Sequence, residues 1–306
     1  MQQLILLVLL ASCWATCAAE DWCYQSQFSC DHHCNAPDDW HQTNSACGGR
    51  SQSPINIVTR KTLRDELLTP FHFDNYQQSF RGSIKNNGHS VQVGVPILST
   101  VSGGGLPTVY KAVQFHLHWG SNGGPGAEHT VDGEQHPMEL HIVHMKHHYT
   151  DLSTALSDPQ GVAVLGFFYE RSGSANRKYE PIVNALQSIK SANGNTTLHS
   201  ISLAQLIPPE HNLTAYYRYW GSLTTPGCSE AVVWTLFENA IPLSAEQLRA
   251  FSELKFHNGK PMEGNFRPVQ PLNGRKVYRS GGAVILASSG LLVAAIAAAV
   301  GLSRSD

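Results

Sequence analysis

The sequence predicts a mainly β (α+β) fold in a single domain, and three observations support this prediction. Short runs rich in β-branched and aromatic residues, bounded by Gly, Pro, Asn or Asp, recur along the chain. Convincing helical patterns are few. No linker-like stretch, repeat or break in composition divides residues 22–279, which leaves one domain of roughly 255 residues, at the large end for a single core. Many short strands with few helices indicate a domain built on a sheet.

The individual elements follow from the same patterns. The best strand candidates, in chain order, are residues 90–95, 113–119, 139–144 and 162–169. The best helix candidates are Lys178 to Lys190 and Ser244 to Leu254. Ser244 is suited to cap the N-terminus of the second helix, ahead of Glu246 in its first turn.

The charge and composition narrow the choice of function. The chain has 306 residues and a net charge of −2, with 21 basic and 23 acidic residues. No run of Lys or Arg is long enough to neutralise a row of phosphates, which argues against nucleic acid as a partner. Sixteen His are present, several of them between positions 116 and 148. Because His is the commonest metal ligand, metal chemistry is the first function to consider.

The N-terminal residues resemble a targeting segment. A short apolar stretch from Leu4 to Leu10 is followed by the small residues Thr16, Ala18 and Ala19. The stretch is too short to span a bilayer, and we expect residues 1–19 to be a secretory signal peptide. The alternative is a buried N-terminal strand or helix.

The C-terminal residues predict a membrane anchor. Ala283 to Leu302 is an apolar stretch of 20 residues, just long enough to span a membrane. The small residues 280–282 precede it, as in a signal for a glycosylphosphatidylinositol (GPI) anchor, with Leu291 to Leu302 as the apolar tail. We expect attachment at Ser280 and removal of residues 281–306. The alternative is a single transmembrane helix.

The cysteines and glycosylation motifs fit an extracellular protein. Of seven Cys, two (Cys13 and Cys17) fall in the expected signal peptide. Disulfides are the default for the other five in a secreted protein, and the odd number leaves one thiol unassigned among the first three. These five are Cys23, Cys30, Cys34, Cys47 and Cys228. Asn-x-Thr motifs at Asn195 and Asn212 predict N-linked glycans.

Three histidines on two predicted strands form a candidate metal site. His116 and His118 are two residues apart, so both face one side of their strand together with Gln114. The next strand carries His141 on the same face as Glu139 and Val143, after a polar, glycine-rich loop long enough for the strand to return beside the first. Three imidazoles can therefore converge on one ion.

The chemistry of this set favours catalytic zinc. Three nitrogen ligands and an open fourth position are typical of catalytic zinc, whereas structural zinc sites are closed by four protein ligands. Gln114 and Glu139 are placed to accept the second N–H of His116 and His141, and so to fix the two rings. The alternative is a polar sheet face without a metal.

Eight motifs in the chain, in their order, resemble those of the alpha-class carbonic anhydrases over nearly the whole mature sequence. The C-terminal tail and the start at Trp22-Cys-Tyr24 are most similar to the GPI-anchored, extracellular membrane-bound form of that family. The motifs are Ser51-Gln-Ser-Pro-Ile-Asn-Ile57, Asn86-Asn-Gly-His89, Gln114-Phe-His-Leu-His-Trp-Gly120, Glu128-His-Thr-Val-Asp132, Glu139-Leu-His-Ile-Val-His144, Ala163-Val-Leu-Gly166, Tyr219-Trp-Gly-Ser-Leu-Thr-Thr-Pro-Gly227 and Asn265-Phe-Arg-Pro-Val-Gln-Pro-Leu272.

The resemblance implies a fold and an activity. The fold would be a large twisted, mostly antiparallel sheet with a few peripheral helices and zinc at the base of a conical cleft, in a catalytic domain of residues 20–280. The activity would be reversible hydration of carbon dioxide to bicarbonate and a proton at the outer cell surface. Sulfonamides would inhibit it, and a bicarbonate transporter is a further partner to consider.

The resemblance also implies roles for single residues. Thr224 would accept a hydrogen bond from the attacking oxygen and donate to Glu128, which aims the attacking lone pair. His89 would be the proton shuttle, because His titrates near neutral pH without perturbation. Asn265 would support the metal ligands. The apolar wall that receives carbon dioxide, with Thr225 beside it, would be Val143, Val164, Leu223 and Trp234, and a water chain would be lined by Tyr24, Asn87 and Gln92.

Without the resemblance, most of these residues have ordinary structural interpretations. Thr224 would be a turn residue before Pro226, His89 a turn histidine, and the apolar residues part of the core. We interpret the remaining histidines as structural or surface residues. They are the pair His32 and His33, and His129, His136, His144, His147 and His148.

The disulfide pairing is likewise implied by the resemblance. The motif Thr-Thr-Pro-x-Cys matches the membrane-bound form and pairs Cys228 with Cys47, which would brace the Thr224 loop against the N-terminal segment. The pairing among Cys23, Cys30 and Cys34 stays open, with Cys23 and Cys34 as the preferred pair.

Two other classes of protein compete with this interpretation. A cupin also uses His-x-His, Glu and a later His, but its Glu follows the second His by a few residues, whereas Glu128 comes ten residues after His118. The second is a catalytically inactive relative that serves as a cell-surface binding module. Such relatives typically lose a zinc ligand, and here all three are present.

Overall fold

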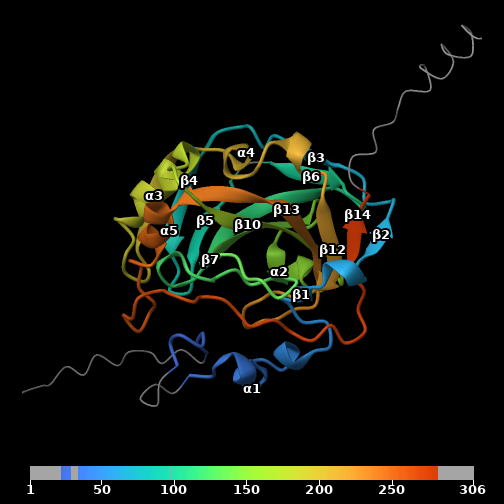
Figure 1. The fold of residues 1–306 in the computed structure, drawn as a ribbon, viewed down its shortest axis with the longest axis horizontal. Coiled ribbons are helices and arrows are strands. Elements are labelled where there is room, and N and C mark those ends of the chain that lie inside the picture. The colour runs from blue at the N-terminus through green and yellow to red at the C-terminus, as the bar shows by residue number, and fades with distance from the viewer. Residues whose placement is uncertain (1–21, 29–33, 97, 282–306) are drawn as a thin grey trace, which may run out of the picture.

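A twelve-stranded mixed sheet dominates the structure, a computed structural model that describes residues 22–28, 34–96 and 98–281 (Figure 1). The path of the sheet runs β11-β4-β5-β7-β9-β10-β13-β12-β14-β2, and β3 and β6 pair with each other beside β7. The strands are β2 (Leu63–Asp65), β3 (Phe71–Asp74), β4 (Phe80–Asn86), β5 (Val91–Gly94), β6 (Thr100–Gly103), β7 (Tyr110–Trp119), β9 (Met138–Lys146), β10 (Val162–Ser172), β11 (Asn195–Ile201), β12 (Tyr216–Gly221), β13 (Val232–Ser244) and β14 (Tyr278–Ser280).

Most strand pairs in this sheet are antiparallel, as expected. The exceptions are β10 with β13 and β14 with β2, which run parallel. A separate parallel pair joins β1 (Asn56–Ile57) to β8 (Thr130–Val131). All four strands predicted from the sequence are confirmed and correspond to β5, β7, β9 and β10, although β5 is one residue shorter at each end than predicted.

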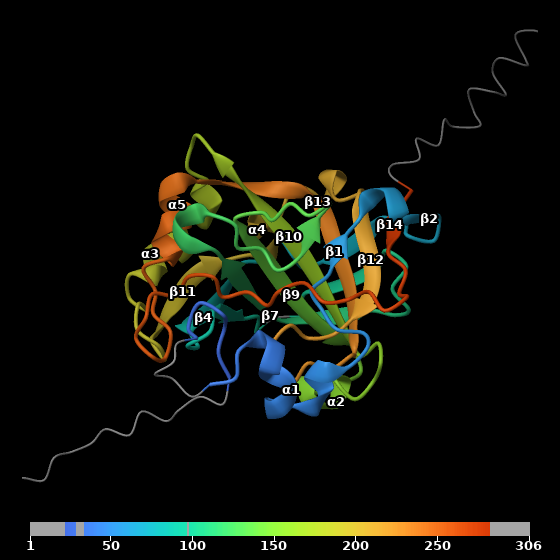
Figure 2. The same cartoon turned by 60° about the horizontal axis from the view of Figure 1, so that its bottom comes forward.

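The helices are short and lie at the periphery of the sheet (Figures 1 and 2). The α-helices are α1 (Trp40–Thr43), α2 (Leu152–Ala155), α3 (Glu180–Leu186), α4 (Leu203–Leu206) and α5 (Ala245–Phe251). The 3₁₀ helices are η1 (Pro37–Asp39), η2 (Ser45–Gly48), η3 (Thr59–Lys61), η4 (Ser121–Gly123), η5 (Arg177–Tyr179) and η6 (Glu210–Asn212). Among the described residues, no helix is long and apolar enough to span a bilayer.

The two predicted helices are present but shorter than expected. The segment predicted as a helix from Lys178 begins with η5 and ends as α3 at Leu186. Ser244 caps α5, and its hydroxyl accepts from the N–H of Gln247, whose side chain bonds back to the Ser244 N–H. The capping partner is thus Gln247, three residues on.

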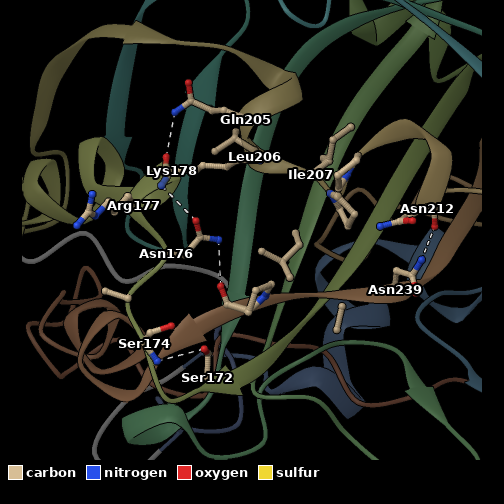
Figure 3. A pocket seen from close by; sticks show the side chains of 16 residues that line it. Ser172, Ser174, Asn176, Arg177, Lys178, Gln205, Leu206, Ile207, Asn212 and Asn239 are labelled. Atoms are coloured by element: carbon tan, nitrogen blue, oxygen red, sulfur yellow. Dashed lines mark hydrogen bonds between the residues drawn. The ribbon is translucent and has the colours of Figure 1, made fainter.

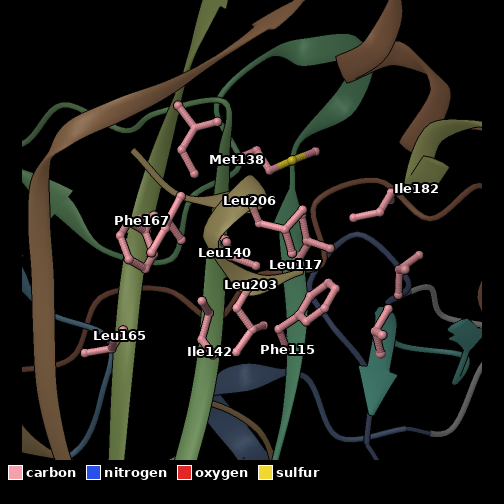
Figure 4. Packing of buried hydrophobic residues seen from close by; sticks show 14 of the residues in the cluster. Phe115, Leu117, Met138, Leu140, Ile142, Leu165, Phe167, Ile182, Leu203 and Leu206 are labelled. Carbon is pink, nitrogen blue, oxygen red and sulfur yellow. The ribbon is translucent and has the colours of Figure 1, made fainter. Parts of the chain in front are cut away.

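The alternation of side chains on the central strands separates the core from the candidate site. On β7, β9 and β10 one set of residues packs into a large apolar cluster with α3 and α4. Figure 4 shows Phe115, Leu117, Leu140, Ile142, Leu165 and Phe167 converging with Ile182, Leu203 and Leu206. Because successive residues of a strand face opposite sides, the intervening histidines and valines face away from this core. Burial of this face therefore fixes the direction of the site residues.

The expected signal peptide, the apolar C-terminal tail and the His32–His33 pair lie outside the described residues, as does Cys30. The described chain ends in the sheet. Ser280 closes β14, where its hydroxyl donates to the Thr214 carbonyl (2.7 Å) and accepts from the Tyr216 N–H (3.0 Å).

Candidate active site

The three predicted metal ligands meet on neighbouring strands. β7 and β9 are antiparallel, with His116 directly opposite His141. Their ring centroids are 5.1 Å apart, and the ring of His118 lies 5.1 Å from His116 and 4.7 Å from His141. One ring nitrogen from each residue lies within 4.8 Å of the other two. Strand pairing thus brings the three imidazoles together.

A different hydrogen-bond acceptor orients each ring. His116 donates from Nδ1 to Gln114 Oε1 (2.9 Å), His118 from Nδ1 to the Asn265 carbonyl (2.7 Å), and His141 from Nε2 to Glu139 Oε1 (2.7 Å). These acceptors fix the tautomers, because each ring must carry its proton on the donating nitrogen. The remaining nitrogens are Nε2 of His116, Nε2 of His118 and Nδ1 of His141, and they therefore carry the lone pairs. The lone pairs of His116 and His141 face each other across 3.3 Å.

This arrangement of lone pairs fits a cation. His118 Nε2 is buried and has no hydrogen-bond partner among the described residues. Burial, followed by the neighbouring imidazoles, lowers the pKa of His116 well below its usual value, and burial likewise lowers the pKa of His118. Neutral rings with convergent lone pairs repel one another unless a positive ion lies between them. The three residues can therefore hold a metal.

Glu139 connects the ligand set to a buried hydrogen-bond chain. Its Oε2 accepts from the backbone N–H groups of Glu128 (2.9 Å) and His129 (2.8 Å). Its Oε1 lies 2.7 Å from both His129 Nδ1 and His141 Nε2. Burial by itself would raise the pKa of Glu139, but the neighbouring imidazoles of His129 and His141, both hydrogen-bonded to it, hold its pKa well below its usual value. The chain continues from His129 to Tyr219 (2.6 Å) and Ser53 (2.8 Å).

His129 is thus a support of the site that sequence reasoning placed only among structural or surface residues. It stands next to Glu128 in the sequence, but the pattern contains no signal that it bonds to Glu139. The second group of possible metal ligands, His129, Glu139 and His141, is this same hydrogen-bonded set. Both ring nitrogens of His129 are already hydrogen-bonded, one to Glu139 and the other to Tyr219, so we assign His129 a supporting role.

Thr224 and Glu128 both lie at the site, but the expected hydrogen bond between them is not formed. Glu128 Oε1 accepts from the Arg267 N–H (2.9 Å). Its Oε2 has no hydrogen-bond partner among the described residues and lies 3.5 Å from His118 Nε2. Thr224 is 5% exposed and lines the cavity in front of the histidines.

A cavity of about 400 Å³ opens onto His116 and His141. All six residues predicted for substrate binding line it, together with Gln92 and Gln114. These six are Val143, Val164, Leu223, Thr224, Thr225 and Trp234. The sequence analysis missed Val113, Gly94 and Leu152 as lining residues. Strict alternation cannot place Val113 and Gln114 on one face, but the register shift between Ala112 and Gln114 does.

A larger cavity of about 590 Å³ lies elsewhere, between the ends of β10 and β13 and the α4 region (Figure 3). Its lining contains no His, Cys, Asp or Glu, and is formed instead by amides, prolines, small residues, three aliphatic side chains and two cations. Asn212, one of the two predicted glycosylation sites, is at its edge, and Asn195 is exposed on β11. The catalytic chemistry therefore belongs to the smaller cavity.

His89 lies at the turn between β4 and β5, and its ring is stacked on that of Trp22 (centroids 3.9 Å apart). Tyr24 and His257 contact it edge-on. Burial, and then the nearby His257, lower the pKa of His89 to about 4. Asn87 caps this turn by accepting from the N–H groups of His89 and Ser90, and its amide donates to Gln92 (3.2 Å). Tyr24 is fully buried.

Two disulfides lie among the described residues, and one of them ties the N-terminal segment to the domain. Cys47 pairs with Cys228 across 181 residues, and Cys23 pairs with Cys34. The first bond joins η2 to the loop that carries Thr224, where Cys228 donates its N–H to the Thr225 carbonyl (2.9 Å). The second holds the segment that carries Trp22 and Tyr24.

A mixed twelve-stranded sheet with three ring-oriented histidines at a cavity is the arrangement of an enzyme built around a site that can hold a metal. The sequence pattern of eukaryotic-type carbonic anhydrases matches residues 35–281, and the chain belongs to this family. As a carbonic anhydrase it catalyses the hydration of carbon dioxide to bicarbonate.

Full-length relatives agree with this placement. The chain is 40% identical over 282 residues to carbonic anhydrase 4 of Rattus norvegicus, with 90% of each chain covered. It is 41% identical over 283 residues to carbonic anhydrase 4 of Oryctolagus cuniculus, with 91% of each covered. It is 39% identical over 295 residues to carbonic anhydrase 15 of Mus musculus, covering 92% of this chain and 90% of the relative.

Proposed function

We propose that the metal of this carbonic anhydrase is zinc and that the enzyme acts at the outer surface of the cell. The observation that carries the first part is the set of three neutral imidazole nitrogens, each oriented by its own acceptor. Three nitrogen ligands with an open position are the donor set of catalytic zinc. In such a site zinc acidifies a water that it holds to a pKa of about 7, a value known from carbonic anhydrases themselves, and so supplies a nucleophile at neutral pH.

The residues around the ligands bind and orient the reactants. The side chains of Val143, Val164, Leu223 and Trp234 give the cavity an apolar wall, which suits an uncharged, apolar gas molecule. The Thr224 hydroxyl has one proton to donate, and Glu128 Oε2 is a buried acceptor without another partner among the described residues. When the Thr224 hydroxyl donates its proton to Glu128, it can only accept a hydrogen bond from the attacking oxygen. This hydrogen bond aims the lone pair of that oxygen.

His89 exports the proton that each cycle releases. In its stack with Trp22 the ring has a pKa lowered to about 4, so at neutral pH it is almost entirely unprotonated there. We therefore propose that the ring carries protons when it leaves this stack for a more hydrated position, where its pKa returns toward the usual value.

The position at the cell surface rests on the sequence of the two ends. The expected signal peptide, the small residues at 280–282 and the apolar tail support secretion followed by GPI attachment at Ser280. The two disulfides and the exposed Asn195 and Asn212 suit the same compartment. A bicarbonate transporter in the same membrane would then exchange substrate and product with the enzyme.

Replacing a ligand tests the zinc assignment. His118→Ala removes one of three donors, and we expect it to abolish hydration and to lower the zinc content well below one ion per chain. His148→Gln, at an exposed residue, is the matched control. Metal analysis and stopped-flow hydration, with an aromatic sulfonamide as inhibitor control, give both readouts. Full activity with stoichiometric zinc in His118→Ala would overturn the assignment, and an inactive zinc-loaded wild type would favour a surface binding module.

A further inference from the structure

His257 is a second histidine beside His89, the residue proposed to export the proton. It lies in the tight turn after α5, where Gly259 N–H bonds to the Phe256 carbonyl and Phe256 N–H to the Lys260 carbonyl. Its side chain is partly exposed, and its ring centroid is 5.6 Å from that of His89. The ring of His89 thus contacts Trp22 face to face and His257 edge-on.

The ring of His257 is held in one orientation. Its Nε2 donates to the Asn87 carbonyl (2.9 Å), which fixes the proton on that nitrogen because a carbonyl can only accept. Gly88 lies directly beneath the ring: a Cβ at this position would come within 1.7 Å of His257 Cδ2 and Nε2. Gly88 also has a φ of +87°, so the turn is doubly suited to glycine. When the ring is neutral, the opposite nitrogen, Nδ1, carries the lone pair.

His257 affects the charge of His89: after burial, its positive charge is the second cause that lowers the pKa of His89. Tyr24, which also faces His89, stays protonated because burial and then Glu128 raise its pKa well above 10. Lys260, the cation in the same turn as His257, donates to the Gln27 carbonyl (3.2 Å).

We propose that His257 is a proton-relay residue, which takes from His89 the proton that leaves the active site and releases it to buffer. The proton moves from a ring nitrogen of His89 to Nδ1 of His257, directly or through one water, while Nε2–H stays bonded to Asn87. Loss of the same proton from His257 to buffer restores the neutral ring. The inference rests on the shuttle role proposed for His89.

His257→Gln separates a relay from a passive neighbour. Gln can still donate an amide N–H to the Asn87 carbonyl, but it cannot carry a proton. In the zinc-loaded enzyme we expect kcat in dilute buffer to fall several-fold, with kcat/KM and the melting temperature unchanged, and concentrated imidazole to restore kcat. The pKa of His89, measured by NMR titration, should rise at the same time because a lowering charge is gone. His199→Gln, at an exposed residue of β11, is the control.

A relay and a passive neighbour predict opposite changes in kcat. If His257 only tuned His89, the stronger base would raise kcat or leave it unchanged, and this result would overturn the relay. The double variant His89→Ala/His257→Gln should be no slower than His89→Ala alone, because the two groups act in series. Additive losses would instead assign His257 an independent route. Loss of kcat in His89→Ala but not in His257→Gln overturns the relay alone, whereas an unaffected His89→Ala overturns the shuttle as well.

Discussion

Glu139 illustrates how one buried side chain prepares a metal ligand. It accepts four hydrogen bonds, two from backbone N–H groups and two from imidazoles. The backbone contacts fix the carboxylate, and the fixed carboxylate in turn fixes the tautomer and direction of His141. Gln114 performs the same task for His116 with a single hydrogen bond from a partly exposed position.

We predict that Glu139→Gln weakens zinc binding by about 10- to 100-fold, the usual effect of removing such a support. The amide nitrogen would face groups that donate hydrogen bonds, so His129 or His141 must turn. Competition with a chromophoric chelator measures the change. Gln114→Ala, with one hydrogen bond lost at a more exposed position, should weaken binding less. A Glu139→Gln variant that binds zinc as tightly as the wild type would show that His141 is oriented by the sheet alone.

His144 makes stability depend on pH. Its ring is fully buried, Nδ1 donates to the Ala163 carbonyl (3.3 Å) and Nε2 accepts from the Tyr76 hydroxyl (2.5 Å). Burial, partly offset by backbone hydrogen bonds, lowers the pKa of His144 from 6.5 to about 4. Between these values the unfolded chain binds a proton that the folded protein does not. Stability is therefore full above pH 6.5 and falls as the pH drops toward 4, by about 3 kcal/mol from this residue.

The prediction for His144→Gln is a flatter pH dependence. Gln can still accept from Tyr76 but does not titrate, so the free energy of unfolding should change less between pH 7 and pH 4 than in the wild type. Denaturant titrations of both proteins at the two pH values measure the difference. Equal slopes for the two proteins would mean that His144 is not the residue that titrates.

The loop between β12 and β13 is the element on which catalysis depends most. It carries Leu223, Thr224 and Thr225, and it is attached at two points. Ser222, at its start, bonds through its N–H to Ser53 Oγ (3.0 Å), and Cys228, at its end, is joined to Cys47 in η2. Both attachments lead to the N-terminal third of the chain.

Removing the Cys47–Cys228 bond should therefore lower both stability and activity. In the chain-entropy model, a loop of this length constrains the unfolded chain by roughly 5 kcal/mol, and the measured benefit is often smaller. We expect Cys47→Ser/Cys228→Ser to lose stability of this order in denaturant titrations and to lose kcat/KM as the Thr224 loop loosens. Peptide mapping of the wild type should recover the two cysteines as one linked pair, and a free thiol at Cys228 would contradict the structure.

The central strands and the three histidines could be predicted from the sequence because both depend on a local pattern, the alternation of side chains between the two faces of a strand. His116, His118 and His141 share faces with Gln114 and Glu139 for this reason alone. The partner of His118 could not be found in this way, since Asn265 lies 147 residues further along the chain. The parallel pairing of β10 with β13 is likewise long-range. The segment from Lys178 stops being helical at Leu186, and shortly afterwards the Lys190 carbonyl accepts from the Lys255 N–H, a tertiary contact.

At the scale of the whole molecule, the chain is a single sheet-based domain with both expected processing segments outside its described part. The family pattern ends at residue 281, next to Ser280, which is hydrogen-bonded within the sheet. Attachment of an anchor at Ser280 would therefore join the membrane to the last residue of β14, with no spacer between them.

A lipase distinguishes the two forms of attachment. We predict that phosphatidylinositol-specific phospholipase C releases the enzyme from the surface of expressing cells, because only a lipid would hold it there. Activity in the supernatant, before and after treatment, measures the release. Retention on the cells would instead favour a transmembrane helix from the apolar tail.

The long sequence separations around the three histidines also set the order of events during biosynthesis. His118 is oriented by the Asn265 carbonyl, 147 residues later. The hydrogen-bond chain from Glu139 to Ser53 is complete only when β12, which carries Tyr219, has joined the sheet. A nascent chain that ends before Asn265 therefore lacks a completed binding site, however much metal surrounds it. The site is therefore assembled by the whole domain, in contrast to the local ligand sets of small zinc-finger domains, which fold only with their metal.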